Sequence, residues 1–242
     1  MPAFALNPFV LNLINSLARF DIQGILVTVL VLTISLSFHE MAHAWAAYKL
    51  GDDTAALQGR LTMNPLAHLD PIGTLMFIFA GFGWAKPVPV NPARFTRTIS
   101  IQRGTMLVSL AGPTGNLILA VAASVLHAAT VLLSVAAGSH GVLDLLENLF
   151  LYLYMANTIL AVFNLLPVPP LDGSKIFGGL LPTNLYYKFL GMERTIGLLF
   201  LMLVIFGRGI LTSILAVVRI PFDLVIWTPV HWLAQWLLQF MA

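Results

Sequence analysis

The chain has 242 residues, of which 59% are hydrophobic and only 9% are charged, and its mean hydropathy is +0.90. A typical globular domain carries about 25% charged residues, so this chain cannot cover a water-facing surface and is expected to be an integral membrane protein. The net charge is +2 without a Lys/Arg-rich tract, which argues against a nucleic-acid partner. Cysteine is absent, so any metal must be held by histidine and carboxylate groups.

The first strong apolar segment runs from about residue 22 to residue 50 and is closed by Gly51. At about 1.5 Å per residue it is long enough to cross a bilayer with some tilt. Residues 1–21 lack a basic stretch and an A-x-A-like site, so no removable signal peptide is expected. Residues 9–17 are instead a candidate for a short interfacial helix.

A metal-site motif, His39-Glu40-Met41-Ala42-His43, lies in the C-terminal half of this first segment. Histidines four apart share one face of a helix, so both can bind one metal ion. Glu40 between them can act as general base on a water at that metal. Such a motif arises by chance in soluble helices, but three ionisable residues in a nearly uncharged membrane span are hard to explain as packing.

Residues 51–103 differ from the rest because they are rich in Gly, Pro and Asn. The apolar stretch 69–82 is too short for a full span, so a re-entrant or partial span is expected. Residues 86–90 read Lys-Pro-Val-Pro-Val. Each Pro favours an extended conformation at the residue before it. An exposed extended edge can pair with a substrate strand, although a loop that only packs fits the sequence equally well.

Further apolar segments predict the remaining membrane helices. They are expected at about 104–137, 143–166 and 194–218, the last of these interrupted by Gly207-Arg208-Gly209, and a final apolar segment follows at about 221–240. The predicted fold is therefore an all-α polytopic membrane protein with four to six transmembrane helices and a re-entrant β-like loop. We expect a single domain over residues 1–242, with a core at 22–193 and C-terminal membrane helices at 194–242.

Basic residues are distributed unevenly between these segments, and their positions predict the orientation. Between the first and second spans lie Lys49, Arg60, Lys86, Arg94, Arg97 and Arg103. After the third span lie Lys175, Lys188 and Arg194. No Lys or Arg lies between the second and third spans, so the positive-inside rule puts residues 51–103 and 173–193 in the cytoplasm. The protein is thus expected to be a multi-pass cell-membrane protein whose metal motif lies toward the cytoplasmic side.

A catalytic zinc site needs a third protein ligand besides the two histidines. Asp172 is the best candidate, because it follows a proline-rich helix end and the orientation brings it to the membrane depth of His39 and His43. Asp70 is a weaker competitor in a turn. Glu193 and Asp223 are expected at ordinary surface positions.

Three further polar residues have two readings each. Asn164 is an uncharged polar residue within a span, so it can bond between helices or donate to a tetrahedral oxyanion. Asn116, in the stretch Gly112-Pro113-Thr114-Gly115-Asn116, is either an interhelical bond beside a kink or part of the site. His68 is expected to be a hydrogen-bonding loop histidine rather than a ligand.

With these motifs in view, the chain resembles the site-2 protease family of intramembrane zinc metalloproteases. The resemblance covers about residues 25–195 and rests on HExxH at 39–43, GPxxN at 112–116 and N-x-x-P-x-x-x-x-D-G at 164–173, in this order on separate segments. The chain has neither the PDZ-like insert nor the CBS-type domain of many members, so it looks like a minimal, prokaryotic member.

The resemblance implies one Zn²⁺ per chain, bound by His39, His43 and Asp172, with Glu40 as the base. It also implies substrate or transition-state contacts for Asn164 and a substrate-holding, membrane-embedded β-like loop within residues 81–92. Members cut transmembrane segments of other proteins, so the expected partners are a transmembrane protein substrate and the lipid bilayer.

Two other classes of function compete with this interpretation. A metal transporter or sensor would need polar ligands at successive depths along a path, whereas this chain shows one cluster at one depth. A catalytically idle binder of membrane proteins commonly lacks the base or a ligand, whereas all four residues are present here. The sequence does not indicate an oligomeric state or name a substrate.

Overall fold

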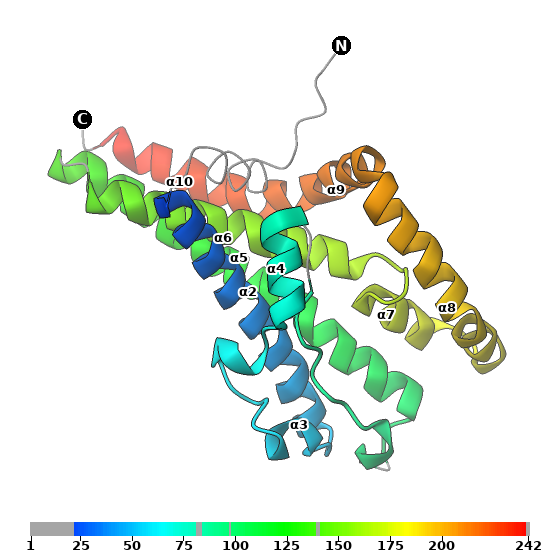
Figure 1. The fold of residues 1–242 in the computed structure, drawn as a ribbon. Coiled ribbons are helices and arrows are strands. Elements are labelled where there is room, and N and C mark those ends of the chain that lie inside the picture. Colours follow the sequence, from blue (N-terminus) through cyan, green and yellow to red (C-terminus); the bar gives the residue numbers. More distant parts are fainter. Residues whose placement is uncertain (1–21, 81–83, 97, 139–140, 241–242) are drawn as a thin grey trace.

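The computed structural model describes residues 22–80, 84–96, 98–138 and 141–240. The candidate interfacial helix at residues 9–17 therefore lies outside the described residues. The described part is mainly helical and contains no strand, which confirms the all-α class (Figure 1). Its elements are α2 (Ile22–Lys49), α3 (Thr54–Leu57), η1 (Pro65–Ala67), α4 (Pro71–Ala80), η2 (Pro92–Arg94), α5 (Ile101–Ala137), α6 (Val142–Leu165), α7 (Asp172–Leu180), α8 (Thr183–Phe206), α9 (Arg208–Phe222), the π-helix η3 (Asp223–Trp227) and α10 (Thr228–Leu238).

Four helical stretches of the described chain are long and apolar enough to cross a membrane. They are Ile22–Lys49, Ile101–Ala137, Val142–Leu165 and Gly209–Leu238. The first three agree with the predicted spans to within a few residues. The protein is therefore a multi-pass membrane protein of the predicted kind.

The fourth span was predicted wrongly. Its helix was expected to start near Arg194 and to run to about residue 218 with an interruption at residues 207–209, but α8 begins at Thr183 and ends at Phe206. The break at Gly207 lies at the predicted interruption, and the chain then continues through α9, η3 and α10 without a further one. Pro221 does not open a separate segment as expected: it lies inside α9, and the π-helical turn that follows takes up the disturbed backbone hydrogen bonding.

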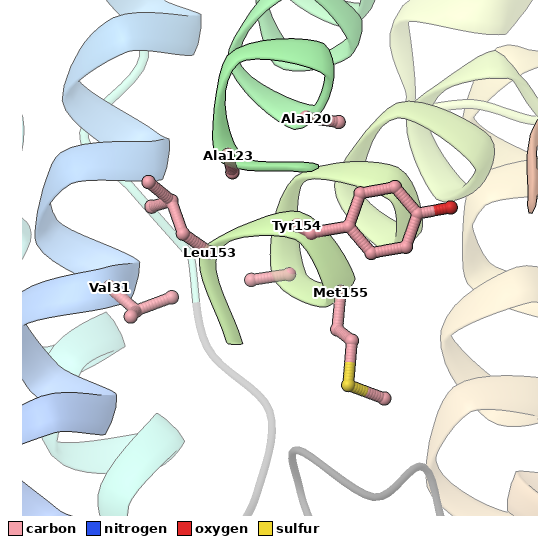
Figure 2. Close-up of a cluster of buried hydrophobic side chains, with 7 residues drawn as sticks. Val31, Ala120, Ala123, Leu153, Tyr154 and Met155 are labelled. Carbon is pink, nitrogen blue, oxygen red and sulfur yellow. The ribbon is translucent and has the colours of Figure 1, made fainter. Parts of the chain in front are cut away.

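The core of the bundle lies between α2, α5 and α6. Figure 2 shows Val31 of α2, Ala120 and Ala123 of α5, and Leu153 and Tyr154 of α6 gathered in one buried cluster. Small residues at such contacts let membrane helices approach closely. The resulting van der Waals packing stabilises helix association in lipid, where no hydrophobic driving force acts between helices. This packing holds α2, which carries the metal motif, against α5.

Asp223 is not at the ordinary surface position that the sequence suggested. Its Oδ2 atom lies 2.8 Å from Nε of Arg219 in an ion pair whose members are 31% and 24% exposed. Its Oδ1 accepts a hydrogen bond from the hydroxyl of Tyr154, a side chain of the buried cluster. Because an unpaired charge in a membrane span is costly, this pair and its tyrosine tie the fourth span to α6.

The predicted partial span corresponds to α4, which has 10 residues. At about 1.5 Å per residue it is roughly half as long as a bilayer core is thick, so it cannot cross on its own. Residues 81–83 lie outside the described residues. Residues 86–90 form no helix, and one antiparallel β-bridge joins Leu69 to Ala85.

Candidate metal centre

Two histidines from α2 begin the site. His39 and His43 are 5% and 8% exposed, and their Nε2 atoms lie 3.0 Å apart. This approach follows from the helix itself, since positions i and i+4 lie one turn apart on the same face.

The third member comes from α7. Oδ2 of Asp172 lies 3.2 Å from Nε2 of His39 and 3.1 Å from Nε2 of His43. Asp172 opens α7, and Gly173 after it packs against the carbonyl groups of Leu165 and Leu166, so closely that a Cβ there would overlap them. The end of α6 therefore fixes where α7 starts, and with it the position of the carboxylate.

Each histidine also makes a hydrogen bond through its other ring nitrogen. Nδ1 of His43 lies 2.8 Å from the backbone oxygen of Val108, which can only accept. Nδ1 of His39 lies 2.6 Å from Oδ1 of Asn116, whose Nδ2 points to the backbone oxygen of Ser35 at 3.3 Å. Both Nδ1 atoms are therefore protonated donors, and both Nε2 atoms direct lone pairs into the site.

The resulting set of atoms fits a zinc ion. Two imidazole lone pairs and a carboxylate oxygen face one another, an arrangement that is repulsive unless a cation lies among them. Zinc ligands at about 2.0–2.1 Å in a tetrahedron are about 3.3 Å apart, close to the three separations of 3.0, 3.1 and 3.2 Å found here. Within the described part of the chain, His39, His43 and Asp172 form the one group of such residues that could hold a metal.

Helix α5 forms the wall behind the histidines. A Cβ atom at Gly112 would overlap Nε2 of His43 and would lie 2.6 Å from Cε1 of His39. One turn further on, a Cβ at Gly115 would lie 3.1 Å from Cβ of Ala42. The small residues of the GPxxN motif thus let α5 approach the metal motif closely.

Glu40 contacts the extended stretch that follows α4. Its Oε2 atom accepts a hydrogen bond of 2.9 Å from the backbone N–H of Val88. The extended stretch after α4 therefore lies against α2 at the residue between the two histidines.

A polar network behind His39 contains a residue that the sequence analysis missed. Asn157 of α6 is fully buried, accepts a 2.7 Å hydrogen bond from Nδ2 of Asn116 and donates a 2.8 Å bond to Oγ of Ser35. It is an amide in the middle of an apolar span, the same signal that drew attention to Asn164, and polar residues at such positions commonly bond between helices.

The other predicted polar residues lie as follows. Asn164 is half-buried and donates to the backbone oxygen of Leu160 within α6, at 3.0 Å. His68 is buried and its Nε2 lies 2.8 Å from the backbone oxygen of Thr62, which confirms it as a hydrogen-bonding loop histidine. Asp70 accepts from the backbone N–H of Gly73 at the start of α4 and does not belong to the metal group.

Comparison with known proteins decides the family. The candidate zinc metalloprotease YwhC of Bacillus subtilis (strain 168) is 44% identical over 184 residues, which cover 75% of this chain and 81% of YwhC. The chain belongs to peptidase family M50. The sequence profile of that family matches residues 129–204, the stretch that contains Asp172.

More distant members of the family share part of the chain. The candidate zinc metalloprotease Rip2 of Mycobacterium tuberculosis is 38% identical over 145 residues, 58% of this chain and 51% of Rip2. The Rip2 of Mycolicibacterium smegmatis is 31% identical over 158 residues, 62% of this chain and 54% of that protein. No solved structure matches the chain.

Membership of family M50 agrees with the donor set in the bundle. The chain is a zinc metalloendopeptidase of the site-2 type, with a His39–His43–Asp172 group that could bind the metal. It is also a multi-pass membrane protein, with four helices suited to a bilayer among the residues that the structure describes.

Proposed function

We propose that this peptidase hydrolyses peptide bonds in or near transmembrane segments of other membrane proteins, and that it does so within the bilayer. The observation that carries the proposal is the meeting of His39 and His43, inside the span Ile22–Lys49, with Asp172, which opens α7 shortly after the span Val142–Leu165 ends. A hydrolytic centre at that place can be reached by a substrate that lies in the membrane.

His39, His43 and Asp172 would hold one Zn²⁺ per chain, and Asn116 and Val108 orient the two imidazoles from behind. A zinc ion bound in such a site lowers the pKa of a bound water to about 7 and polarises the scissile carbonyl group. Ligand orientation through the second ring nitrogen is the usual role of such partners. Asn116 therefore acts on His39, since its amide is buried between three helices.

Glu40 is the proposed general base. It lies between the two ligands in the sequence, and Val88 holds one of its carboxylate oxygens, Oε2. The other oxygen can take the proton from the attacking water and pass it to the leaving amine. Asn164 remains the proposed contact to the substrate oxyanion, because its Nδ2 carries two hydrogens and the bond to Leu160 uses one.

A cavity beside the site supports an apolar substrate. It measures about 890 Å³ and is lined by Leu171, the neighbour of Asp172, by Trp84 of the extended stretch, and by Gly197 and Leu198 of α8. Lys175 and Arg194 also line it, with Glu193. An apolar segment that lies here would have its peptide bonds next to Asp172 and its polar end beside these charges.

We further propose that the protein resides in the cell membrane with this site toward the cytoplasm. The basic residues between the first two spans and after the third support that orientation. The proposed single domain, residues 1–242, has its chemistry in α2, α5, α6 and α7, while α8 to α10 flank it (Figure 1).

The test is Glu40→Gln, with Glu147→Gln on α6 as a matched control. We expect the Glu40→Gln protein to bind zinc at the wild-type stoichiometry and to lose cleavage of a reconstituted transmembrane substrate. The control should cleave like the wild type. Full proteolysis by Glu40→Gln would overturn the assigned mechanism, and failure of the wild type to cut any membrane-spanning substrate would overturn the proposed substrate class.

A further inference from the structure

The extended stretch from Ala85 to Asn91 is attached to the loop that follows α2. At its start, the N–H of Lys86 donates to the backbone oxygen of His68 at 2.7 Å. At its end, the N–H of Asn91 donates to Oδ2 of Asp52 at 2.6 Å. The stretch is therefore held at both ends by one neighbouring segment.

A third attachment lies between these two. Nη2 of Arg60 donates to the backbone oxygen of Lys86, and it reaches the backbone oxygen of Pro87 at 3.3 Å. A guanidinium group can donate to two carbonyl groups at once because its N–H groups are fixed in a plane. Arg60 thereby fixes two consecutive residues of the stretch.

Both charged anchors are buried. Asp52 is 0% exposed and Arg60 is 6% exposed, although charged side chains are almost never fully buried unless they are paired. The bonds to the extended stretch, together with Thr54, satisfy both oxygens of Asp52 and Nη2 of Arg60, whereas Nε of Arg60 is buried without a hydrogen-bond partner. Burial of two charged side chains costs free energy. A stretch that only covered a surface would not need such anchors, so the position of this stretch matters.

The sequence of the stretch determines which residue can reach Glu40. Pro87 and Pro89 have no backbone N–H, so Val88 is the single backbone donor among these three residues. Val88 lies between the Arg60 and Asp52 attachments and donates to Oε2 of Glu40 at 2.9 Å. A slip of the stretch by one residue would place a proline opposite Glu40 and would leave the carboxylate without this bond.

We propose that Arg60 and Asp52 are positioning residues for Glu40: they fix the register of the Ala85–Asn91 stretch, and Val88 transmits it to the carboxylate. The inference rests on the proposed function, in which Glu40 is the base. Val88 holds Oε2, so Oε1 is the oxygen assigned to take the proton. Displacement of a reacting group by about 1 Å can cost about 100-fold in rate.

The test compares Arg60→Gln and Asp52→Asn with two exposed neighbours, Arg94→Gln and Asp53→Asn. Arg94 and Asp53 form an ion pair of 2.6 Å in the same loop region, with exposures of 48% and 40%. We expect the two buried substitutions to lower kcat on a reconstituted transmembrane substrate by about 10- to 100-fold, with KM and zinc content unchanged. Arg60→Lys should recover part of the loss, since an ammonium group can still donate to one carbonyl, and the two exposed substitutions should leave kcat unchanged.

A second pair of variants tests the link to Glu40 without touching the anchors. Val88→Pro removes the N–H donor, whereas Val88→Ala keeps it and removes only the side chain. We expect kcat of Val88→Pro to be at least about tenfold below that of Val88→Ala, again with full zinc content. This comparison also decides the matter if the anchor variants fail to fold.

The outcomes separate this inference from the proposed function. If the wild type cleaves, Glu40→Gln does not, and Arg60→Gln has the kcat of Arg94→Gln, the positioning role is wrong while the function stands. Equal kcat values for Val88→Pro and Val88→Ala would likewise overturn it. If Glu40→Gln cleaves fully, Glu40 is not the base, and the assigned mechanism fails together with this inference.

Discussion

Oδ1 of Asn116 on α5 lies 2.6 Å from Nδ1 of His39 on α2. This bond decides which imidazole nitrogen faces the carboxylate of Asp172, because the N–H must point to the amide oxygen. The same amide donates to Asn157 on α6 at 2.7 Å. One side chain therefore connects the metal motif to both other helices of the core.

Asn116→Ala should lower zinc affinity about 10- to 100-fold, the usual loss when the partner behind a ligand histidine is removed. Isothermal titration or competition with a chelator would measure it. Ser124→Ala is a suitable control, because Ser124 is buried on the same helix and its Oγ has no hydrogen-bond partner. Wild-type affinity in Asn116→Ala would show that His39 is oriented without the amide.

Gly112→Ala should impair metal binding more than Gly115→Ala does. The new Cβ at position 112 would overlap the His43 ring, whereas at position 115 it would lie 3.1 Å from the methyl group of Ala42 and demand a smaller shift. Overpacking of this kind costs about 1–3 kcal/mol. Zinc stoichiometry of the two purified variants would check the order, and equal zinc loading in both would contradict it.

Asp172→Ala should abolish stoichiometric zinc binding and, with it, the stabilisation that a chelator removes from the wild type. A ligand at 1,000 times its Kd stabilises a folded protein by about 4 kcal/mol. The thermal unfolding midpoint of the wild type should therefore fall on chelation, and that of Asp172→Ala should not respond. Unchanged zinc affinity in Asp172→Ala would remove Asp172 as a ligand.

Gly197→Trp should block the cavity between α7 and α8 and raise KM for a transmembrane substrate. Gly197 lines that cavity, whereas Gly209 has open space around its Cβ position and does not line it. Gly209→Trp is therefore the matched control and should keep the wild-type KM. If both variants have the wild-type KM, the substrate approaches the site by another route.

Much of the fold was predictable because each long apolar run must become a helix in lipid, where every backbone group needs an internal partner. That reasoning placed α2, α5 and α6 to within a few residues. It failed around Pro221, where local rules predict a helix start and the π-turn of η3 lets the helix continue. Asp223 was misjudged because its contact with Tyr154 on α6 depends on helix packing that the sequence does not show, and because the helix that pairs it with Arg219 was not expected to continue through Pro221.

The site divides in the same way. The sequence by itself determined the residue types of the metal group, because the i, i+4 spacing of His39 and His43 and the absence of cysteine leave carboxylates as partners. Only the tertiary structure decided that the Nδ1 atoms are bound from behind, and that Val88 meets Glu40. The physical reason is that a helical repeat fixes neighbours within one turn, whereas contacts between segments far apart in the chain depend on how closely small residues such as Gly112 and Gly173 let the helices pack.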